Sequence, residues 1–535
     1  MALFVANIPF TDGPDPAAGA EVRARLAERL GVPERDFVEI VLVRRSLDVR
    51  ARTPIWRGNF RVSVAGDEAA VVARRPAGVR LWGPRDEVRR TGDVPVGTHP
   101  DWARRPIIVG AGPAGLFAAL RLAEAGAPAV LLDRGGMVEE RVPAVNRFWR
   151  GGPLDPENNI LYGEGGAGTF SDGKIYTRRR DGELGWIFRT LVEAGADPGI
   201  LDEAWAHLGT DRVRAILPRL RARLRDAGVE VRFGARVDRF LVEGGRCVGV
   251  ELHGGEKILG GPVIVATGHS ARDTFRALLE AGAVADPRPI AIGARIEHPQ
   301  DLIDRARYPT GRGTLPAASY RLAWTPPQGR AAYTFCMCPG GLVVPAQSEP
   351  GQVVVNGMSF STRRARWANS ALIVQVTPSD YPGADPLAGV RFQEAIERRA
   401  YAVAGEGYAA PAQRVVDFLA GQASVDLPPI SYPQGGVPVD LAALLPVGVV
   451  EGMRDAIRRF DREIPGFAGA GGVLIAPETR TTSPLRFRRD EQTYESPTLP
   501  GLLPCGEGAG YAGGIISAAL DGFRAAERII RDARR

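Results

Sequence analysis

The stretch Pro106-Ile-Ile-Val-Gly110-Ala-Gly-Pro-Ala-Gly115 decides the fold of this chain. Its apolar first half is typical of a buried parallel strand, and its second half has the spacing G-x-G-x-x-G. A helical segment follows, and the next apolar run, Ala129-Val-Leu-Leu132, ends at Asp133. An acid about 20 residues after the first glycine is placed to accept hydrogen bonds from a ribose. Together these features predict a dinucleotide-binding βαβ unit.

Each position of this first glycine motif (residues 110–115) has a physical role. Gly110 permits a tight turn, Gly112 lets the backbone approach a pyrophosphate, and Gly115 lets the helix pack against the strand. Pro113 and Ala114 open the helix, whose N-terminal N–H groups and positive dipole end attract phosphate. We therefore expect the motif to bind the pyrophosphate of a dinucleotide.

A second glycine-rich stretch near the other end of the chain is Gly506-Glu-Gly-Ala-Gly-Tyr-Ala-Gly-Gly514, here termed the closing segment. It resembles the C-terminal segment of FAD enzymes that returns to the βαβ unit and covers the flavin end of FAD, and the resemblance implies the same placement here. A helix is predicted from about Ile515, with its N-terminus at the N1/C2=O edge of the flavin. The dipole of that helix would stabilise negative charge as N5 accepts a hydride.

Three segments resemble those that contact the cofactor in FAD enzymes similar to glutathione reductase. Residues 228–240 resemble a strand pair that brackets the adenine, here at Val237. Val263-Ile-Val-Ala-Thr-Gly268 resembles the strand near the pyrophosphate. Leu502-Leu-Pro-Cys-Gly-Glu507 resembles the strand whose acid bonds the ribityl chain, with glutamate in place of the commoner aspartate. The resemblance implies FAD rather than NAD.

The glycine loop (residues 163–174) reads Gly-Glu-Gly-Gly-Ala-Gly-Thr-Phe-Ser-Asp-Gly-Lys. In related flavoproteins the segment at this place runs beside the pyrophosphate and the isoalloxazine. Its glycines permit close approach of the backbone, and the hydroxyls of Thr169 and Ser171 can donate to flavin oxygens. A flexible surface loop is the alternative interpretation. The full set of predicted FAD-binding residues is Gly110, Gly112, Pro113, Ala114, Gly115, Asp133, Arg134, Arg141, Gly165, Gly166, Thr169, Ser171, Val237, Ala266, Thr267, Gly268, Gly506, Glu507, Gly513, Gly514 and Ile515.

With these motifs the chain resembles a widespread family of bacterial and plastid FAD-dependent dehydrogenases, over residues 105–530. Further segments that carry the resemblance are Phe335-Cys-Met-Cys-Pro-Gly-Gly341, Val355-Asn-Gly-Met-Ser359 and Glu478-Thr-Arg-Thr-Thr-Ser-Pro484. The resemblance implies a glutathione-reductase-like FAD fold. Because the substrates of the family are mostly unknown, it informs fold and cofactor better than reaction.

The expected fold class is α/β with three domains. A Rossmann-type FAD-binding domain is expected at residues 104–280 and 470–535, interrupted by a mainly antiparallel β substrate domain at 281–469. Residues 1–95 are predicted to form a small α+β domain of ferredoxin-like type, with Val22, Leu26 and Leu30 on one helix face. A linker rich in proline and glycine is expected at 91–106.

Composition excludes several classes of protein. The net charge of +6 is spread over 535 residues, and no basic run with interleaved aromatics indicates nucleic-acid binding. No apolar run approaches the roughly 20 residues of a membrane span, and the N-terminus does not resemble a signal peptide. Four cysteines do not make a disulfide scaffold, and five histidines with no second cysteine pair argue against a metal site. We expect a cytoplasmic protein.

Lys174 and His269 are the candidate proton-transfer groups, because both lie on segments predicted to approach FAD. A histidine at a strand end can equally be structural. Cys336 and Cys338 would share one face of a strand, as buried structural residues, as a substrate-cleft wall or as a redox pair. Arg480 and Arg486 could clamp an acidic substrate, or could be ordinary surface arginines.

The reaction is less constrained than the cofactor. One dinucleotide fingerprint of full quality is present, so electrons would come from the organic substrate, from transiently bound NAD(P)H or from a partner that the sequence does not identify. The leading hypothesis is an FAD-dependent dehydrogenase that moves a hydride between a small organic substrate and flavin N5. The alternatives are a single-component FAD monooxygenase and a flavin-binding redox scaffold without turnover.

Overall fold

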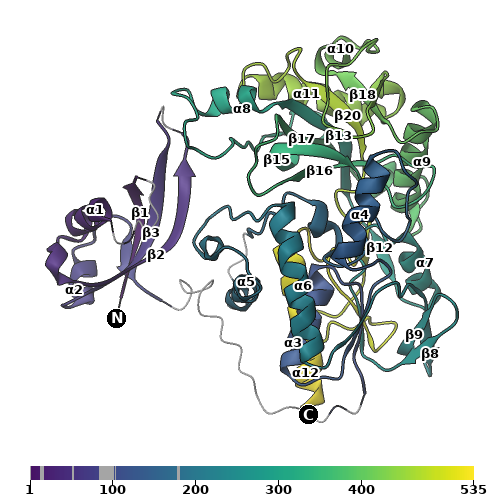
Figure 1. The fold of residues 1–535 in the computed structure, drawn as a ribbon, viewed down its shortest axis with the longest axis horizontal. Helices are drawn as coiled ribbons and strands as arrows, with labels where there is room; N and C mark the ends of the chain where they lie inside the picture. Colours follow the sequence, from purple (N-terminus) through teal and green to yellow (C-terminus); the bar gives the residue numbers. More distant parts are fainter. Residues whose placement is uncertain are drawn as a thin grey trace. The chain divides into compact units, whose positions relative to one another are not determined.

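The computed structural model describes residues 2–11, 17, 19–50, 53–83, 102, 104–177 and 181–534 (Figure 1). The chain divides into two compact units. Unit 1 comprises residues 1–95, 174–208 and 307–314, and unit 2 comprises residues 96–173, 209–306 and 315–535. The predicted linker at 91–106 falls largely outside the described residues.

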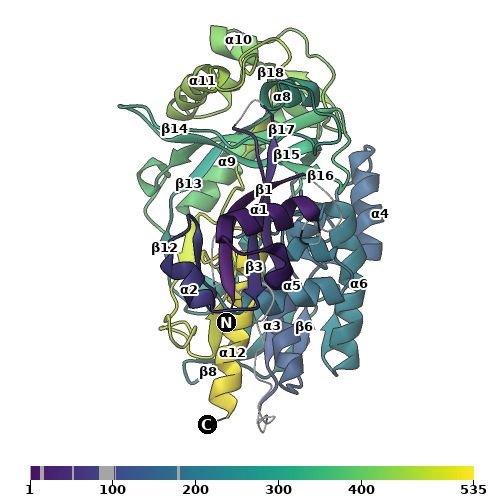
Figure 2. The same cartoon turned by 90° about the vertical axis from the view of Figure 1, so that its left-hand side faces the viewer.

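Unit 1 opens with the element order βαββαβ. The elements are β1 (Leu3–Phe10), α1 (Ala20–Leu30), β2 (Phe37–Asp48), β3 (Ile55–Val64), α2 (Glu68–Ala73) and β4 (Val79–Leu81). The strands form an antiparallel sheet in the order β2-β3-β1-β4. Val22, Leu26 and Leu30 of α1 are buried in its core, as their spacing predicts, and Figure 2 shows α1 lying across the strands.

Residues 174–208 belong to unit 1 through pairing with the end of β2. Arg45 donates its backbone N–H to Asp202 and accepts one from Ala204, and its side chain forms an ion pair with Glu203. The segment carries α5 (Leu184–Glu193) and a 3-10 turn, η4 (Pro198–Leu201). A lone antiparallel bridge joins Lys174 to His207 at its two ends.

Unit 2 contains a five-stranded parallel sheet in the order β22-β11-β5-β6-β7. Its strands are β5 (Ile107–Val109), β6 (Val130–Leu132), β7 (Glu230–Arg232), β11 (Val263–Val265) and β22 (Leu502–Pro504). The accompanying helices are α3 (Pro113–Glu124), α6 (Thr210–Asp226), α7 (Arg272–Glu280) and α12 (Ile515–Ala533). The last strand and last helix of the chain thus return to the unit that the first glycine motif opens. A small antiparallel sheet of β8 (Val237–Glu243), β9 (Arg246–Leu252) and β10 (Lys257–Leu259) accompanies it.

A second, eight-stranded sheet in unit 2 is mainly antiparallel, with one parallel pair between β18 and β19. Its strands are β13 (Ile290–Pro299), β14 (Ala323–Trp324), β15 (Ala332–Pro345), β16 (Val355–Ser359), β17 (Trp367–Val376), β18 (Ala410–Arg414), β19 (Gly436–Pro438) and β20 (Val473–Glu478). Figure 1 shows α11 (Val447–Asp461) covering one face of this sheet. Gly452 permits the approach, since a Cβ there would lie 2.9 Å from Val374 Cγ1.

The remaining helices are α4 (Val138–Trp149), α8 (Gln300–Arg307), α9 (Ala388–Val403) and α10 (Val415–Ala420), and β12 (Ala285–Pro287) pairs with β21 (Leu485–Phe487).

The chain is therefore of mixed α/β class, as predicted.

Candidate functional site

The two glycine-rich stretches lie side by side in unit 2. They follow the carboxyl ends of β5 and β22, which lie on either side of β11 in the parallel sheet, at the edge where ligands bind in open α/β sheets. A Cβ atom added to Gly110 would lie 2.4 Å from the carbonyl oxygen of Ala266, and one added to Gly508 would lie 2.3 Å from that of Gly268. A Cβ atom on Gly506 would lie 3.0 Å from Ala114 Cβ. The first glycine motif, the end of β11 and the closing segment therefore lie against one another in the fold.

The first glycine motif has the geometry of a phosphate-binding turn. Gly110 has a φ of +105°, a conformation that favours glycine. Pro113 is the first residue of α3 and Gly112 is its N-cap. Among the described residues, no acceptor is found for the backbone N–H groups of Gly112, Ala114 and Gly115. Unpaired N–H groups at a helix N-terminus attract phosphate, so this turn fits the pyrophosphate of FAD.

The glycine loop packs against both of the other stretches. Gly165 donates its N–H to the carbonyl of Ala111 at 2.8 Å. A Cβ on Gly166 would lie 3.1 Å from Gly112 Cα, and one on Gly168 would lie 3.3 Å from the side chain of Ile515. These glycines thus approach other segments of the protein closely, as backbone at Gly112 and as a side chain at Ile515.

The closing segment leaves open space in front of α12. Gly513 and Gly514 are exposed, and a Cβ atom on either would meet no atom of the described residues within 4 Å. The helix α12 begins at Ile515, as predicted. Asp521 fixes the start of the segment, since its carboxylate accepts from Gly506 N at 2.7 Å and pairs with Arg489 at 2.6 Å. The open space and the helix N-terminus together fit the flavin.

Asp133 holds the loops of the site together. Its carboxylate accepts from the backbone N–H groups of Ala111 at 2.6 Å and of Gly135 and Gly163, each at 2.9 Å. The side chain is 6% exposed, and burial raises its pKa against the effect of these donors. The acid stands where the ribose contact is predicted, but its three described partners are backbone groups.

Arg134 and Arg141 have protein partners in place of the predicted contacts with the cofactor. Arg134 forms ion pairs with Glu157 and Asp273, at 2.5 and 2.7 Å. The fully buried Arg141 donates to the carbonyls of Asn159, at 2.9 Å, and Glu164, at 2.5 Å. Burial lowers the pKa of Arg141 to about 9. Both arginines position the loops around the site.

The hydroxyl groups of the glycine loop also point inward. Thr169 is fully buried, and its hydroxyl donates to the carbonyl of Glu164 at 2.9 Å. Ser171 donates to the carbonyl of Gly168 at 2.9 Å. The expectation that these hydroxyls donate to flavin oxygens is therefore corrected, because each already has a carbonyl acceptor within the loop. Val237, predicted to bracket the adenine, is buried in the core at the start of β8.

His269 lies at the site, directly after Gly268. Its Nδ1 is 3.1 Å from Ser270 Oγ. Burial, with the charges of Arg480 and Arg272, lowers the pKa of His269 to about 4. The imidazole is therefore neutral at physiological pH and can accept a proton, whereas it cannot serve as a standing acid. Lys174 belongs to unit 1, and its role in catalysis stays a prediction.

The structure corrects the role predicted for Arg480. The residue is 7% exposed, and its side chain forms a bidentate ion pair with Glu397, at 3.0 Å from Nε and 2.7 Å from Nη2. Its Nη1 donates to Ser348 Oγ at 2.9 Å, and Nη2 also donates to Gln352 Oε1 at 2.8 Å. Burial would raise the pKa of Glu397, but the charges of Arg272 and Arg480 lower it to about 2. Because Glu397, Ser348 and Gln352 already bind its guanidinium group, Arg480 positions the segment near His269 and is not a substrate clamp.

Cys336 and Cys338 do not share one face of β15. Phe335 pairs with Ala371 and Cys338 with Asn369, so the strand carries a bulge between them. Cys336 has a φ of +42° and is exposed, whereas Cys338 is buried. Strict alternation of side chains is therefore broken at the bulge, and the two cysteines differ in exposure. None of the four cysteines forms a disulfide.

Glu507 and Arg486 lie on or beside the closing segment. Glu507 is half-buried, and burial raises the pKa of its carboxyl to about 7, against the opposing charge of Arg288. Arg486 is exposed on β21 and donates to the carbonyl of Gly510 at 3.2 Å from both Nε and Nη2. Glu507 thus stands at the position predicted to bond the ribityl chain, and Arg486 stays available to a ligand.

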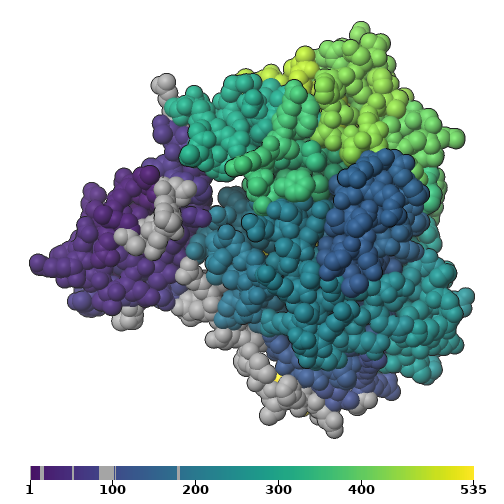
Figure 3. All heavy atoms as spheres, in the orientation of Figure 1, coloured from purple at the N-terminus to yellow at the C-terminus, as the bar shows by residue number. Residues whose placement is uncertain are grey.

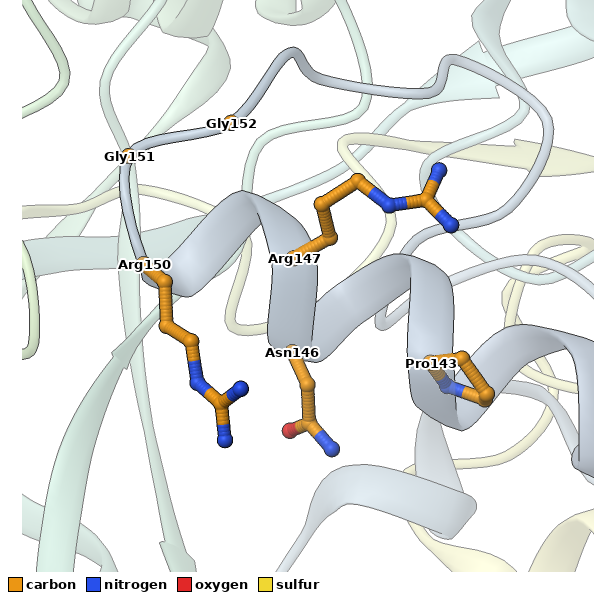
Figure 4. Close-up of a pocket in the computed structure, with 6 residues that line it drawn as sticks. All are labelled: Pro143, Asn146, Arg147, Arg150, Gly151 and Gly152. Carbon is orange, nitrogen blue, oxygen red and sulfur yellow. The ribbon is translucent and has the colours of Figure 1, made fainter.

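A shallow pocket of about 630 Å³ lies elsewhere, at the C-terminal end of α4, which Figure 3 shows at the surface in blue. Figure 4 shows its lining residues, Pro143, Asn146, Arg147, Arg150, Gly151 and Gly152. None of them is a predicted site residue. In the described part of the chain there is no cluster of metal-ligating side chains and no helix long and apolar enough to cross a membrane.

Two sequence comparisons place the chain among known proteins. Residues 289–481 match the family model described as "FAD-dependent protein, C-terminal domain-like". An uncharacterised protein of Clostridium beijerinckii is 39% identical over 511 residues, which is 95% of each chain. The chain belongs to the same family as this protein. The family match confirms that FAD is the cofactor and that the protein is a flavoprotein of the oxidoreductase class.

Solved structures similar to this FAD-dependent protein are more distant. The flavin-dependent brominase Bmp2 is 13% identical, covers 80% of this chain and 79% of its own, and gives a TM-score of 0.36. A geranylgeranyl bacteriochlorophyll reductase-like protein of Thermoplasma acidophilum is 12% identical, covers 80% and 78%, and gives 0.35. At such identities and TM-scores the similarities carry no inference about the reaction.

Sequence reasoning missed several residues of the site in this FAD-dependent protein. Asp521 and Arg489 form a nearly buried ion pair below the closing segment, and Arg288 donates to Gly510. Asp521 could have been identified from the sequence, because it is a charged residue on the apolar face of α12. Arg288 could not, because β12 and β21 are far apart in sequence and pair only in the folded chain.

Proposed function

We propose that the chain is an FAD-dependent dehydrogenase that transfers a hydride between a small organic substrate and flavin N5. The observation that carries this proposal is the meeting of the first glycine motif, the glycine loop and the closing segment around unpaired N–H groups at α3. We assign the parallel sheet and its helices to a Rossmann-type FAD-binding domain, and the eight-stranded sheet to the substrate domain.

In this proposal the residues of the chain bind FAD and provide partial charges that act on the flavin. The N-terminus of α3 holds the pyrophosphate, and the N-terminus of α12 faces the flavin and favours negative charge on it. FAD, when bound, supplies the hydride acceptor at N5. Glu507, at the end of β22, would bond the ribityl chain with its carboxyl.

His269 is the group that would accept the proton released when a substrate C–H and its neighbouring O–H or N–H are oxidised. Its neutral imidazole lies one residue beyond Gly268, and with Nδ1 beside Ser270 Oγ the proton would be taken at Nε2. Because the pKa of His269 is lowered to about 4, the imidazole is a weak base, and at neutral pH it would pass the accepted proton on to water. Arg480 and Arg272 therefore set the strength of this base through their charges.

The experiment is an anaerobic screen in which the purified yellow protein is mixed with metabolites and with NAD(P)H, and bleaching of the flavin is recorded. A donor whose oxidised product accumulates without oxygen incorporation supports the dehydrogenase. A product that contains oxygen from O₂ favours the single-component monooxygenase. A flavin that no donor bleaches favours the scaffold without turnover, and a colourless protein that also fails to take up added FAD overturns the proposal.

A further inference from the structure

Two arginines converge on one carbonyl oxygen of the closing segment. Arg288 Nη1 donates to Gly510 O at 2.9 Å, and Arg486 donates to the same oxygen from Nε and Nη2 at 3.2 Å. The pairing of β12 with β21, in which Asp286 faces Arg486, sets the two side chains next to each other. A carbonyl carries only a partial charge, so two guanidinium groups share one weak acceptor.

No carboxylate of the described residues forms an ion pair with either arginine. Among the described residues, neither Arg288 nor Arg486 forms an ion pair within 4.0 Å. Asp286 is bound by Arg488, at 2.8 Å from Nε and 2.6 Å from Nη2. Burial and the nearby charge of Arg486 lower the pKa of Arg288. Two like charges therefore lie side by side at the closing segment. The nearby acids, Glu507 by Arg288 and Asp286 opposite Arg486, form no ion pair with them among the described residues.

The surrounding residues hold the two arginines in place. Arg288 donates its backbone N–H to Pro484 at 2.9 Å, and its carbonyl accepts from the hydroxyl of Tyr381 at 2.6 Å. The guanidinium of Arg486 lies 4.9 Å from the centroid of the Tyr511 ring. Gly510 has a φ of +88°, and a Cβ there would lie 2.9 Å from Arg288 Nη1. The closing segment is thus shaped around the pair.

One acid near the pair is only partly charged. Glu507 shares the closing segment with Gly510, and its carboxyl, with a pKa raised to about 7, is protonated in a large fraction of molecules at neutral pH. The other acid below the segment, Asp521, is committed to Arg489. An anionic ligand would therefore meet two cations with little competition from acids of the chain.

We propose that Arg288 and Arg486 form a binding site for an anionic group, carboxylate or phosphate, of the molecule that exchanges electrons with the flavin. The proposal rests on the proposed function, because it places the flavin at the closing segment. Planar guanidinium forks bind both kinds of oxyanion, so the shared chemistry is an oxyanion with two or three accepting oxygens. A phosphate would come from a nicotinamide dinucleotide, and a carboxylate from an organic acid.

The experiment titrates the FAD-loaded protein with sodium sulfate and, separately, with sodium benzoate, at constant ionic strength. The readouts are the visible spectrum of the flavin and the melting temperature. Saturable changes are expected for the wild type with at least one anion. R288Q and R486Q should each raise the dissociation constant of the anion about tenfold or more, which is the scale of one lost charge-assisted hydrogen bond. The double variant D286N/R488Q is the matched control, since it removes the exposed ion pair beside the site without freeing a carboxylate that could neutralise Arg486, and it should bind as the wild type does.

The outcomes separate this proposal from the proposed function. FAD content is measured first, without anion, and a protein that does not hold FAD overturns the proposed function. A wild type that keeps FAD but shows no saturable response to either anion overturns the anion site alone. If R288Q and R486Q do not fold, R288K and R486K retain the charge without the fork. Unchanged binding in those two variants also contradicts the site, whereas weaker binding supports it. A response to sulfate alone points to the phosphate source and one to benzoate alone to an organic acid.

Discussion

A Cβ atom added to Gly115 would lie 1.8 Å from the carbonyl oxygen of Gly110. The contact joins the third glycine of the motif to the first, across the turn that leads from β5 to α3. Backbone cannot move away as a flexible side chain does, so α3 can sit against the strand only when residue 115 is glycine. The same helix supplies the unpaired N–H groups of the site, and its position therefore decides whether a pyrophosphate is bound.

The first prediction is that Gly115→Ala destabilises the protein by about 1–3 kcal/mol, the usual effect of forcing an extra group into a packed interior, and also weakens FAD binding. Chemical unfolding and FAD titration measure the two effects. Gly112→Ala is the control, because its Cβ would meet only Gly166 Cα, at an ordinary 3.9 Å. It should change the free energy of unfolding of the FAD-free protein by less than about 0.5 kcal/mol while still weakening FAD binding. Equal stability of both variants would contradict the packing argument.

The second prediction concerns Asp133, whose carboxylate satisfies three backbone N–H groups. Asp133→Ala leaves these buried donors unpaired and should lower the free energy of unfolding of the FAD-free protein by about 3 kcal/mol or more. Asp133→Asn keeps one acceptor oxygen and should cost less. A purely ribose-binding role predicts a different result, with unchanged stability and FAD affinity lower by about 1.5–3 kcal/mol. Urea unfolding of the FAD-free variants decides between the two.

Local sequence predicted those parts of the site whose geometry depends on few residues. The turn at Gly110, the start of α3 at Pro113 and the start of α12 at Ile515 each follow from residues within a few positions of them. The meeting of the first glycine motif with the closing segment could be predicted only because the resemblance to flavoproteins fixed the order of the strands. Periodicity alone would not have joined β22 to β11.

The predictions were wrong where a side chain contacts a residue that is distant in sequence. Arg480 pairs with Glu397, 83 residues earlier, and no local pattern joins the two. The alternation of side chains is interrupted between Cys336 and Cys338 because β15 has one extra residue opposite β17. Such a bulge depends on how the two strands pair and cannot be predicted from one strand alone. Thr169 resembles an exposed loop hydroxyl in sequence, but the fold turns it toward Glu164.

The third prediction is that His269 stays neutral down to about pH 5, because burial and the charges of Arg480 and Arg272 lower its pKa to about 4. Protons then bind the unfolded chain more readily than the native one between pH 6.5 and 4, so this residue's contribution to stability is complete above pH 6.5 and lost as pH falls through 4. Imidazole nitrogen shifts of the ¹⁵N-histidine-labelled protein measure the titration, and His269→Gln assigns the signal. A midpoint near 6.5 would show that the cations do not act on this ring.

The fourth prediction concerns Glu507, whose carboxyl has a pKa raised to about 7 by burial. Its unfolded pKa is near 4.3, so its contribution to stability is complete below that value and is lost as pH rises through 7. Glu507→Gln cannot ionise and should escape the loss, gaining about 1–2 kcal/mol relative to the wild type between pH 5 and pH 8, a figure reduced for partial exposure. Unfolding of both FAD-free proteins at these two pH values measures the difference. A gap that does not change with pH would mean that Glu507 titrates as an exposed glutamate.

The last prediction tests the placement of α12 against the flavin. A Cβ atom on Gly513 would meet no atom of the described residues within 4 Å, so Gly513→Ala should leave the FAD-free protein as stable as the wild type. If the flavin lies in that open space, the added methyl group pushes it from the helix N-terminus. The dipole there is worth about 0.3–1 kcal/mol to a nearby negative charge, so the midpoint potential of retained FAD should fall by about 6–20 mV. Redox titration of the variant beside the wild type gives the sign. A potential that stays constant or rises, with full FAD occupancy, would mean that α12 does not face the flavin and that the space before it serves another ligand.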